Sequence, residues 1–252
     1  MGAAYDSYDY PAYWKEREYE HESEVFALRS FLAKIPRINK VIEIGGGYGR
    51  LTPTYLYRAK TATLTDPSAK LLSLARSQLK DYQNVRFTQT SLENLKNKFR
   101  GGSFDVALMI RVLHHLPDLE GTISSVEHIL SQEGYFIFEF ANKIHAKAIL
   151  THLLRRDFGF LNDTTPIDIR SKKSILAKTL PFLNYHPKTI KEILAKYNFE
   201  IIEKRSVSNI RNPLIKKHIP ISLLLWAEKL LQRPLSYLNF GPSIFILAQK
   251  KG

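Results

Sequence analysis

The stretch of sequence that decides the fold runs from residue 41 to residue 50: Val41-Ile42-Glu43-Ile44-Gly45-Gly46-Gly47-Tyr48-Gly49-Arg50. It begins as an apolar run typical of a buried strand, continues with four glycines in five positions, and leads into a helical pattern. Glycine is needed where the backbone adopts a positive φ or approaches a ligand too closely for a Cβ. We therefore interpret this stretch as a strand, a ligand-binding loop and the start of a helix.

The spacing of the glycines indicates the kind of ligand. A dinucleotide fingerprint requires Gly-x-Gly-x-x-Gly, but the third position is Arg50 when counted from Gly45 and Thr52 when counted from Gly47. The pattern that fits is Glu-x-Gly-x-Gly-x-Gly, made by Glu43, Gly45, Gly47 and Gly49. A carboxylate at the end of the strand suits a ligand that carries an ammonium group, held directly or through water.

A second acid follows the next predicted strand. Asp66 lies 21 residues after Gly45, where a carboxylate binds ribose hydroxyls in folds of this type. The alternative is that Asp66 caps the helix that begins near Ser68.

The rest of the chain alternates strand-like and helical patterns. We predict helices over residues 12–35, 49–58, 68–79, 119–130, 142–156 and 187–197, an irregular-to-helical segment over residues 212–233, and strands over residues 40–44, 61–65, 85–88, 104–110, 135–140, 199–206 and 243–249. Alternation of this kind predicts an α/β fold with a doubly wound, mostly parallel seven-stranded sheet and helices on both faces.

Three further segments resemble a known family. They are residues 85–95, residues 104–118 with Phe-Asp and Leu-His-His-Leu-Pro-Asp, and residues 130–139 with Gly-Tyr-Phe-Ile-Phe-Glu. Together with the glycine loop and Asp66, they make residues 38–141 similar to the class I S-adenosylmethionine-dependent methyltransferases, in particular the methyltransferase type 11-like subgroup. The resemblance implies a Rossmann-like sheet whose last strand is antiparallel, and S-adenosyl-L-methionine as the cofactor.

The resemblance also implies which residues bind the cofactor. They are Glu43, Gly45, Gly47, Gly49, Asp66, Pro67, Ser91, Leu92 and Arg111. Ser91 stands where the family usually has an acid that reads the adenine amino group, and it offers one uncharged hydrogen bond instead. Arg111 stands where the family's backbone meets the methionine part of the cofactor.

We expect three regions along the chain. Residues 1–37 are predicted to form an amino-terminal helical lid, residues 38–141 the cofactor-binding core, and residues 142–252 the rest of the sheet with two helical insertions, 142–186 and 209–240. In the lid, Tyr13, Trp14 and Arg17 are candidates for covering the cofactor, because aromatic faces attract a sulfonium cation. The alternative is that these residues pack the helix on the core.

Methyl transfer from a sulfonium is an in-line displacement, so an enzyme mainly aligns the nucleophile with the methyl group and excludes water. A base is needed only if the acceptor must lose a proton. His114 or His115 is a candidate base at the cofactor edge of the sheet; the alternative is ordinary packing. Three other histidines are candidates for facing the substrate: His145, His152 and His186. We predict no metal site.

The charge is distributed unevenly. Residues 1–140 contain 17 Lys and Arg and 17 Asp and Glu, whereas residues 141–252 contain 20 and 7, which accounts for the net charge of +13. This excess predicts an anionic partner: a phosphate-bearing substrate, nucleic acid or an acidic membrane surface. A solvated basic surface is the alternative. Residues 213–233 combine a basic cluster with an apolar helix around Trp226, which suits peripheral membrane contact, a cover for a hydrophobic substrate, or a packed lid.

Composition excludes several chemistries. The chain contains no cysteine, so disulfides, thiolate metal sites and the cysteine attack of cytosine C5 methylation are excluded. We predict methyl transfer to a small or lipid-like, anionic acceptor; the alternatives are an RNA methyltransferase acting on ribose or ring nitrogens, and a non-catalytic cofactor-binding protein. The first ten residues lack the layout of a secretory signal, so we expect a cytoplasmic protein, with contact at the membrane surface as a further option. The oligomeric state is not predicted.

Overall fold

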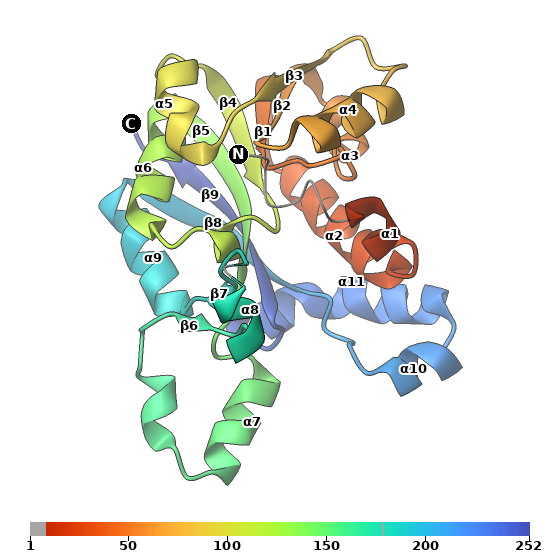
Figure 1. Cartoon of the computed structure of the whole chain (residues 1–252), viewed down its shortest axis with the longest axis vertical. Helices are drawn as coiled ribbons and strands as arrows, with labels where there is room; N and C mark the ends of the chain where they lie inside the picture. Colours follow the sequence, from red (N-terminus) through yellow and green to blue (C-terminus); the bar gives the residue numbers. More distant parts are fainter. Residues whose placement is uncertain (1–8, 178) are drawn as a thin grey trace.

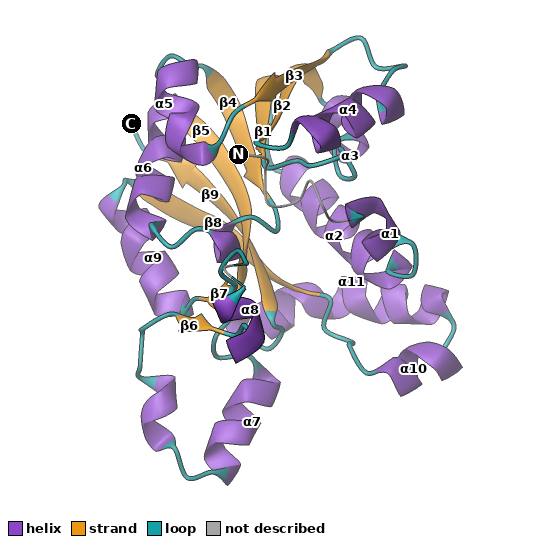
Figure 2. Ribbon diagram, viewed as in Figure 1, coloured by secondary structure: helices purple, strands orange, loops and turns teal. Residues whose placement is uncertain are grey.

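A computed structural model describes residues 9–177 and 179–252. These residues form a seven-stranded sheet in the order β3-β2-β1-β4-β5-β9-β8, with helices on both faces (Figure 1, Figure 2). Its strands are β1 (Ile38–Ile44), β2 (Ala59–Asp66), β3 (Val85–Gln89), β4 (Phe104–Met109), β5 (Leu130–Ala141), β8 (Phe199–Val207) and β9 (Ser243–Lys250). Strand β9 pairs antiparallel with both β5 and β8, while the other pairs are parallel. The predicted fold class is confirmed.

The central strands contain continuous apolar runs because both of their faces are covered. In β4, Val106 and Leu108 pack in one buried cluster, whereas Ala107 and Met109 pack in a second cluster on the other face. Successive side chains of a strand point to opposite faces, so a strand that is buried on both sides has no polar alternation. This is why the strands of residues 38–141 are recognisable in the sequence.

The helices are divided between the two faces. One face is covered by α2 (Glu18–Leu32), α3 (Pro53–Leu56) and α4 (Ala69–Gln78), and the other by α5 (Leu95–Lys98), α6 (Leu119–Ile129) and α9 (Pro187–Lys196). The carboxyl ends of all the parallel strands meet at one edge of the sheet, and ligands of open α/β sheets bind at that edge.

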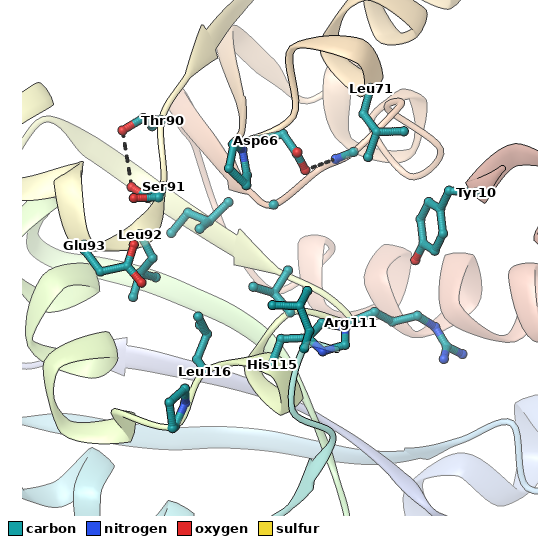
Figure 3. Close-up of a pocket in the computed structure, with 17 residues that line it drawn as sticks. Tyr10, Asp66, Leu71, Thr90, Ser91, Leu92, Glu93, Arg111, His115 and Leu116 are labelled. Carbon is teal, nitrogen blue, oxygen red and sulfur yellow. Dashed lines mark hydrogen bonds between the residues drawn. The ribbon is translucent and has the colours of Figure 1, made fainter. Parts of the chain in front are cut away.

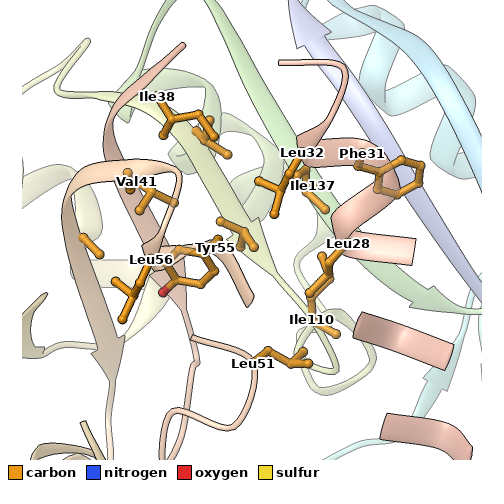
Figure 4. Close-up of a cluster of buried hydrophobic side chains, with 14 of the residues drawn as sticks. Leu28, Phe31, Leu32, Ile38, Val41, Leu51, Tyr55, Leu56, Ile110 and Ile137 are labelled. Carbon is orange, nitrogen blue, oxygen red and sulfur yellow. The ribbon is translucent and has the colours of Figure 1, made fainter. Parts of the chain in front are cut away.

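The amino-terminal region differs from the predicted lid. In place of one helix over residues 12–35, α1 (Tyr10–Trp14) is followed by a break and then by α2. Leu28, Phe31 and Leu32 of α2 are fully buried against the sheet, where they face side chains of β1, β4 and β5 (Figure 4). The expectation of a lid is therefore wrong for α2, which is a core helix. Residues 1–8 of the predicted lid lie outside the described residues.

The two insertions follow β5 and β8. The first contains α7 (Ala146–Leu154), a short 3-10 helix (Phe158–Leu161), α8 (Lys172–Leu176) and a two-stranded sheet of β6 (Ile167–Asp168) and β7 (Leu183–Asn184). The second, predicted to run from irregular to helical over residues 212–233, contains two helices, α10 (Pro213–His218) and α11 (Ile221–Tyr237). The break falls at Ile219, which is extended because it precedes Pro220. Both insertions project from the carboxyl edge of the sheet (Figure 1).

No helix in the described part of the chain has the length and apolar character needed to cross a bilayer.

The core position of α2 gives a prediction for stability. Leu28→Ala removes a fully buried side chain and should lower the free energy of unfolding by about 2–5 kcal/mol in urea denaturation. Leu74→Ala, at a half-exposed position of α4, is the matched control and should change it by less than about 1 kcal/mol. If Leu28→Ala lowers the free energy of unfolding no more than the control does, α2 covers the core loosely, as a lid does.

Candidate active site

The glycine loop after β1 has the backbone that its sequence demands. Gly45, Gly47 and Gly49 have φ values of +68°, +58° and +80°, in the left-handed region that favours glycine. A Cβ on Gly45 would lie 2.5 Å from Val112 Cγ2, whereas a Cβ on Gly47 would make ordinary van der Waals contacts with Leu71 and Tyr10 atoms 3.8 Å away. Gly45 is therefore required for packing, and Gly47 is favoured by its positive φ.

Asp66 joins this loop to the next one. Its Oδ2 accepts a hydrogen bond from the Gly47 backbone N–H at 3.0 Å, and its Oδ1 accepts from the Ser68 N–H at 2.8 Å. Helix α4 is capped instead by the Ser68 hydroxyl, which accepts from the Leu71 N–H. Asp66 thus orients both loops, and Ser68 performs the capping that we considered for Asp66.

A first cavity of about 310 Å³ lies in front of these loops at the carboxyl edge (Figure 3). Seven of the predicted cofactor residues line it: Gly45, Gly47, Asp66, Pro67, Ser91, Leu92 and Arg111. Residues not named from the sequence line it as well, among them Tyr10, Ile44, Thr90, Glu93 and Val112. Glu93 could have been noticed, because it is the nearest acid after β3.

Glu43 and Gly49 do not line this cavity. The Glu43 carboxylate is buried behind the loop, where its Oε2 accepts hydrogen bonds from the Thr52 hydroxyl at 2.6 Å and the Tyr55 hydroxyl at 2.7 Å. Burial raises the pKa of Glu43, although these two hydroxyls oppose the shift. The interpretation of Glu43 as a direct ligand of an ammonium group is therefore corrected. Gly49 is a packing position, since a Cβ there would lie 2.9 Å from Leu79 Cδ1.

The aromatic residues of α1 are arranged differently from the expectation. Tyr10 lines the first cavity, and the three candidates Tyr13, Trp14 and Arg17 do not. The Trp14 ring is buried and already holds a cation, because the Arg50 guanidinium lies 3.4 Å from its centroid. Arg17 stacks on Tyr13 at 4.1 Å. The alternative, in which these side chains pack the helix on the core, fits Trp14.

A buried carboxylate on α2 holds two arginines of the site. Glu24 is fully buried, and its two oxygens pair with Arg50 Nη2 and Arg111 Nη2, each at 2.5 Å. Burial alone raises the pKa of Glu24, but the Arg111 and Arg50 guanidinium groups outweigh it and hold the pKa below its ordinary value. Helix α2 is thereby tied to the glycine loop through Arg50 and to the segment after β4 through Arg111.

Arg111 itself has an unusual backbone. Its φ is +59°, and its N–H donates a hydrogen bond to the buried carboxylate of Glu139 at 3.1 Å. Glu139 also accepts from the Ser243 hydroxyl at 2.6 Å. Left-handed backbone at a residue other than glycine is costly and often found at functional sites. Here it directs the Arg111 side chain toward Glu24.

The two adjacent histidines face different cavities. His115 lines the first cavity, and its Nδ1 lies 2.7 Å from the Pro181 carbonyl oxygen, so Nδ1 carries the proton. His114 is buried and stacks on Phe182, with 4.3 Å between the ring centroids. Burial lowers the pKa of both histidines, and that of His114 well below its ordinary value. Both imidazoles are therefore neutral at neutral pH.

A second cavity of about 470 Å³ shares Arg111 with the first. His114, Glu139, Asn184, His145, Lys147 and Arg211 are among the polar residues that line it. His114 Nδ1 and Asn184 Oδ1 are buried and have no hydrogen-bond partner among the described residues. Buried polar atoms normally have partners, so these two atoms indicate a polar ligand in the second cavity.

Of the three other candidate histidines, only His145 lines a cavity. His152 pairs with Asp157 at 2.8 Å and stacks on Phe160. His186 begins α9, where its Nδ1 accepts from the Lys188 N–H and its Nε2 donates to the Leu161 carbonyl oxygen. These hydrogen bonds give His152 and His186 structural roles.

Comparison with known proteins identifies the family of the region around the glycine loop. Residues 42–138 match the family model described as a methyltransferase domain. This part of the chain is a class I S-adenosylmethionine-dependent methyltransferase domain. The cofactor of this methyltransferase family is S-adenosyl-L-methionine, as the sequence predicted.

Solved structures share the fold of this chain. A putative S-adenosylmethionine-dependent methyltransferase from Listeria monocytogenes superposes with a TM-score of 0.63 and 15% identity, and the match covers 92% of this chain and 99% of that one. The N-methyltransferase NodS from Bradyrhizobium japonicum WM9, solved with S-adenosyl-L-homocysteine, gives a TM-score of 0.62 at 14% identity, covering 98% and 94%. At these identities the likeness extends to the fold.

Curated relatives are far longer than this methyltransferase. The highly reducing polyketide synthase AFT9-1 of Alternaria alternata is 28% identical over 225 residues, which is 81% of this chain and 7% of that protein. The chain spans only 3–7% of the length of the first three curated relatives that it matches.

The Glu24 cluster gives a pH-dependent prediction. Glu24→Gln leaves two guanidinium groups without their carboxylate, and it should lower the free energy of unfolding by about 3–5 kcal/mol at pH 7. Because the folded pKa lies below the ordinary value of 4.5, the difference from wild type should shrink as the pH falls below 4.5 and through the lowered pKa. Urea denaturation of both proteins between pH 3 and about pH 7 measures this difference in the free energy of unfolding.

Glu18→Gln, at an exposed position of the same helix, is the control and should change the free energy of unfolding by less than about 1 kcal/mol. A Glu24→Gln penalty that stays constant from pH 7 to pH 3 would contradict the ionised pairing of Glu24.

Proposed function

We propose that this chain transfers a methyl group from S-adenosyl-L-methionine, bound in the first cavity, to a small or lipid-like, anionic acceptor bound in the second cavity. The single observation that carries this proposal is the junction of the two cavities at Arg111, beside a glycine loop of the methyltransferase family. The methyl group would cross from one cavity to the other at that junction.

The first cavity fits the cofactor. Gly47 lines the cavity at the glycine loop, where the methionine part would lie, and Asp66 lines it from the end of β2, where the family places a carboxylate on the ribose hydroxyls. Ile44, Leu92 and Val112 supply apolar surface for the adenine ring. The cofactor supplies an activated methyl group, and the protein supplies position and exclusion of water.

Glu93 is our candidate for recognising the adenine amino group. It lines the first cavity two residues beyond Ser91, which takes the position of the family's usual acid but bears no charge. A carboxylate accepts hydrogen bonds from an amino group more strongly than a hydroxyl does. Glu93 would thus replace the acid that the sequence lacks at position 91.

His115 is our candidate for the base if the acceptor must lose a proton. The proton on Nδ1 is held by the Pro181 carbonyl, so the lone pair lies on Nε2 in the neutral ring. Burial lowers the pKa of His115, which keeps the ring in this basic form at neutral pH. His114 is disfavoured for this role because its pKa is lowered further and it lines the other cavity.

The second cavity suits an acceptor with an anionic group and hydrogen-bond donors. Lys147, His145 and the exposed Arg211 bring cationic or donor groups to its wall. Asn184 Oδ1 can only accept a hydrogen bond, so it suits a methyl acceptor that carries an N–H or O–H group. The solved neighbours include an N-methyltransferase and the carbon methyltransferase CurJ, so likeness of fold alone names no acceptor atom.

Enzyme activity is tested by release of S-adenosyl-L-homocysteine in the presence of a panel of amphiphilic carboxylates and phosphates. Release that depends on one class of acceptor is expected. Tight binding of S-adenosylmethionine without release on any acceptor would favour the non-catalytic alternative, and release only with RNA, abolished by ribonuclease, would favour RNA methylation.

Gly47→Val tests the cofactor cavity. A valine side chain would enter the space between Leu71 and Tyr10, at a φ that β-branched residues rarely adopt. Titration calorimetry should show at least about a hundredfold loss of S-adenosyl-L-homocysteine affinity, since steric filling removes much of the binding free energy. Circular dichroism should show a folded protein. Gly159→Val, in the exposed 3-10 helix Phe158–Leu161 and without positive φ, is the control and should bind normally. Retained affinity in Gly47→Val would contradict the placement of the cofactor.

His115→Phe tests the base with whichever acceptor is turned over best. Since the pKa of His115 lies below 6.5, wild-type kcat/KM should be flat near pH 7 and fall only below pH 6.5. The variant should lose about 10²–10⁴ in kcat and lose that acid limb. His128→Gln, at an exposed position on α6, should keep the wild-type kcat and the wild-type fall of kcat/KM at acid pH. A variant with the wild-type pH profile would show that the acceptor needs no base from His115.

A further inference from the structure

Helix α11 presents most of its large apolar side chains to solvent, whereas Leu224 and three polar side chains face the protein. Glu228, Gln232 and Ser236 are buried to 99% or more, one helical turn apart. By contrast, Trp226 is 60% exposed and Leu230 is 57% exposed. An amphipathic helix on a globular protein ordinarily has the reverse arrangement.

Specific hydrogen bonds fix this orientation. The Glu228 carboxylate accepts from the Tyr19 hydroxyl at 2.6 Å and from the Ser208 N–H at 2.7 Å. Gln232 Nε2 donates to the Ser23 carbonyl oxygen at 2.9 Å. Rotating α11 to bury its leucines would leave these polar groups without hydrogen-bond partners. Each lost partner would lower the stability of the fold. The outward orientation of the apolar side chains is therefore a built feature of the fold.

The exposed apolar side chains continue along α10 and the end of α11. We define the outer face as six exposed side chains: Leu214, Leu223, Trp226, Leu230, Leu231 and Tyr237. Their exposed fractions range from 42% to 69%. An exposed apolar surface of this extent marks an interaction site in a protein that is otherwise well packed.

The segment that carries the outer face has an excess of basic residues. Residues 209–240 contain five basic residues, Arg211, Lys216, Lys217, Lys229 and Arg233, and one acid, Glu228. Because Glu228 is buried, no acidic side chain of this segment reaches solvent. A second copy of this chain would bring the same positive charge against itself, which disfavours a dimer through this face.

We propose that the outer face docks on an anionic lipid membrane, with α11 lying in the plane of the interface. Apolar side chains on one side of a helix enter the boundary between headgroups and acyl chains, and flanking lysines and arginines meet anionic headgroups. Trp226 and Tyr237 are of the aromatic types that favour this boundary. The proposal goes beyond the methyl-transfer function and does not depend on it.

The position of the outer face adds a consequence for the enzyme. Helices α10 and α11 follow β8, whose carboxyl end lies at the same edge of the sheet as both cavities (Figure 1). Docking would bring this edge close to the bilayer surface, where an amphiphilic acceptor is concentrated.

Vesicle co-sedimentation tests the proposal. The full chain should sediment with vesicles of phosphatidylcholine and phosphatidylglycerol, and at least about tenfold more weakly with phosphatidylcholine alone, because the basic residues contribute through the surface potential. Raising the salt concentration should weaken binding to the anionic vesicles, since exposed charges are screened.

Two pairs of variants locate the contact. Trp226→Ser combined with Leu230→Ser should weaken partitioning by about tenfold or more, because it removes apolar area from the outer face. Tyr57→Ser is the control: its side chain is 67% exposed, and it lies just before β2, at the opposite edge of the sheet. Lys217→Glu combined with Arg233→Glu should weaken binding to anionic vesicles only, whereas Lys60→Glu, at that opposite edge, should have little effect.

Fluorescence gives an independent readout. The chain has two tryptophans, of which Trp14 is buried and Trp226 is exposed. Anionic vesicles should shift the tryptophan emission to shorter wavelength. The Trp226→Phe protein should show no such shift, although it should still sediment with the vesicles.

Three results would overturn the proposal. They are absence of binding to anionic vesicles, equal binding by the Trp226→Ser, Leu230→Ser protein and wild type, and a dimer in sedimentation velocity that this double variant dissociates. The last result would show that a second copy covers the outer face. Loss of vesicle binding leaves cofactor affinity unaffected, so the outcome is distinguishable from failure of the proposed methyl transfer.

Discussion

The buried carboxylate of Glu24 is the interaction on which the arrangement of the site depends. It lies on α2 and holds Arg50, next to the glycine loop, and Arg111, at the end of β4. A buried charge is tolerated only when it is paired, and here each partner is itself partly shielded from solvent. The Arg111 backbone is held as well, because its N–H donates a hydrogen bond to Glu139. Helix α2, the cofactor loop and the junction between the cavities are therefore positioned together.

This arrangement separates two tasks. The first cavity is built from backbone and apolar surface around Asp66, as binding of a constant cofactor requires. The second cavity, formed largely by the insertions, brings cationic groups and unpaired polar atoms to a space that suits a variable acceptor. Part of the positive charge of residues 141–252 lies at two places: Lys147 and Arg211 line the second cavity, and four further basic residues, Lys216, Lys217, Lys229 and Arg233, lie on α10 and α11. Both features favour an anionic, amphiphilic environment.

The sheet and most of the cofactor cavity could be predicted because local sequence encodes them. Strands buried on both faces read as continuous apolar runs, and left-handed turns require glycine, as at Gly47. Side-chain direction could not be predicted. Glu43 turns toward Thr52 and Tyr55, and α11 buries Glu228 because Tyr19, 209 residues earlier, donates to it. Such pairings follow from tertiary contacts, which outweigh the amphipathic pattern of one helix.

A crystal structure of the chain with S-adenosyl-L-homocysteine would show directly whether the first cavity holds the cofactor and the second the acceptor. We expect the ribose at Asp66, the adenine beside Leu92 and Glu93, and the sulfur directed toward Arg111 and the second cavity. A ligand bound elsewhere, or one whose sulfur points away from the second cavity, would contradict the assignment of the two cavities.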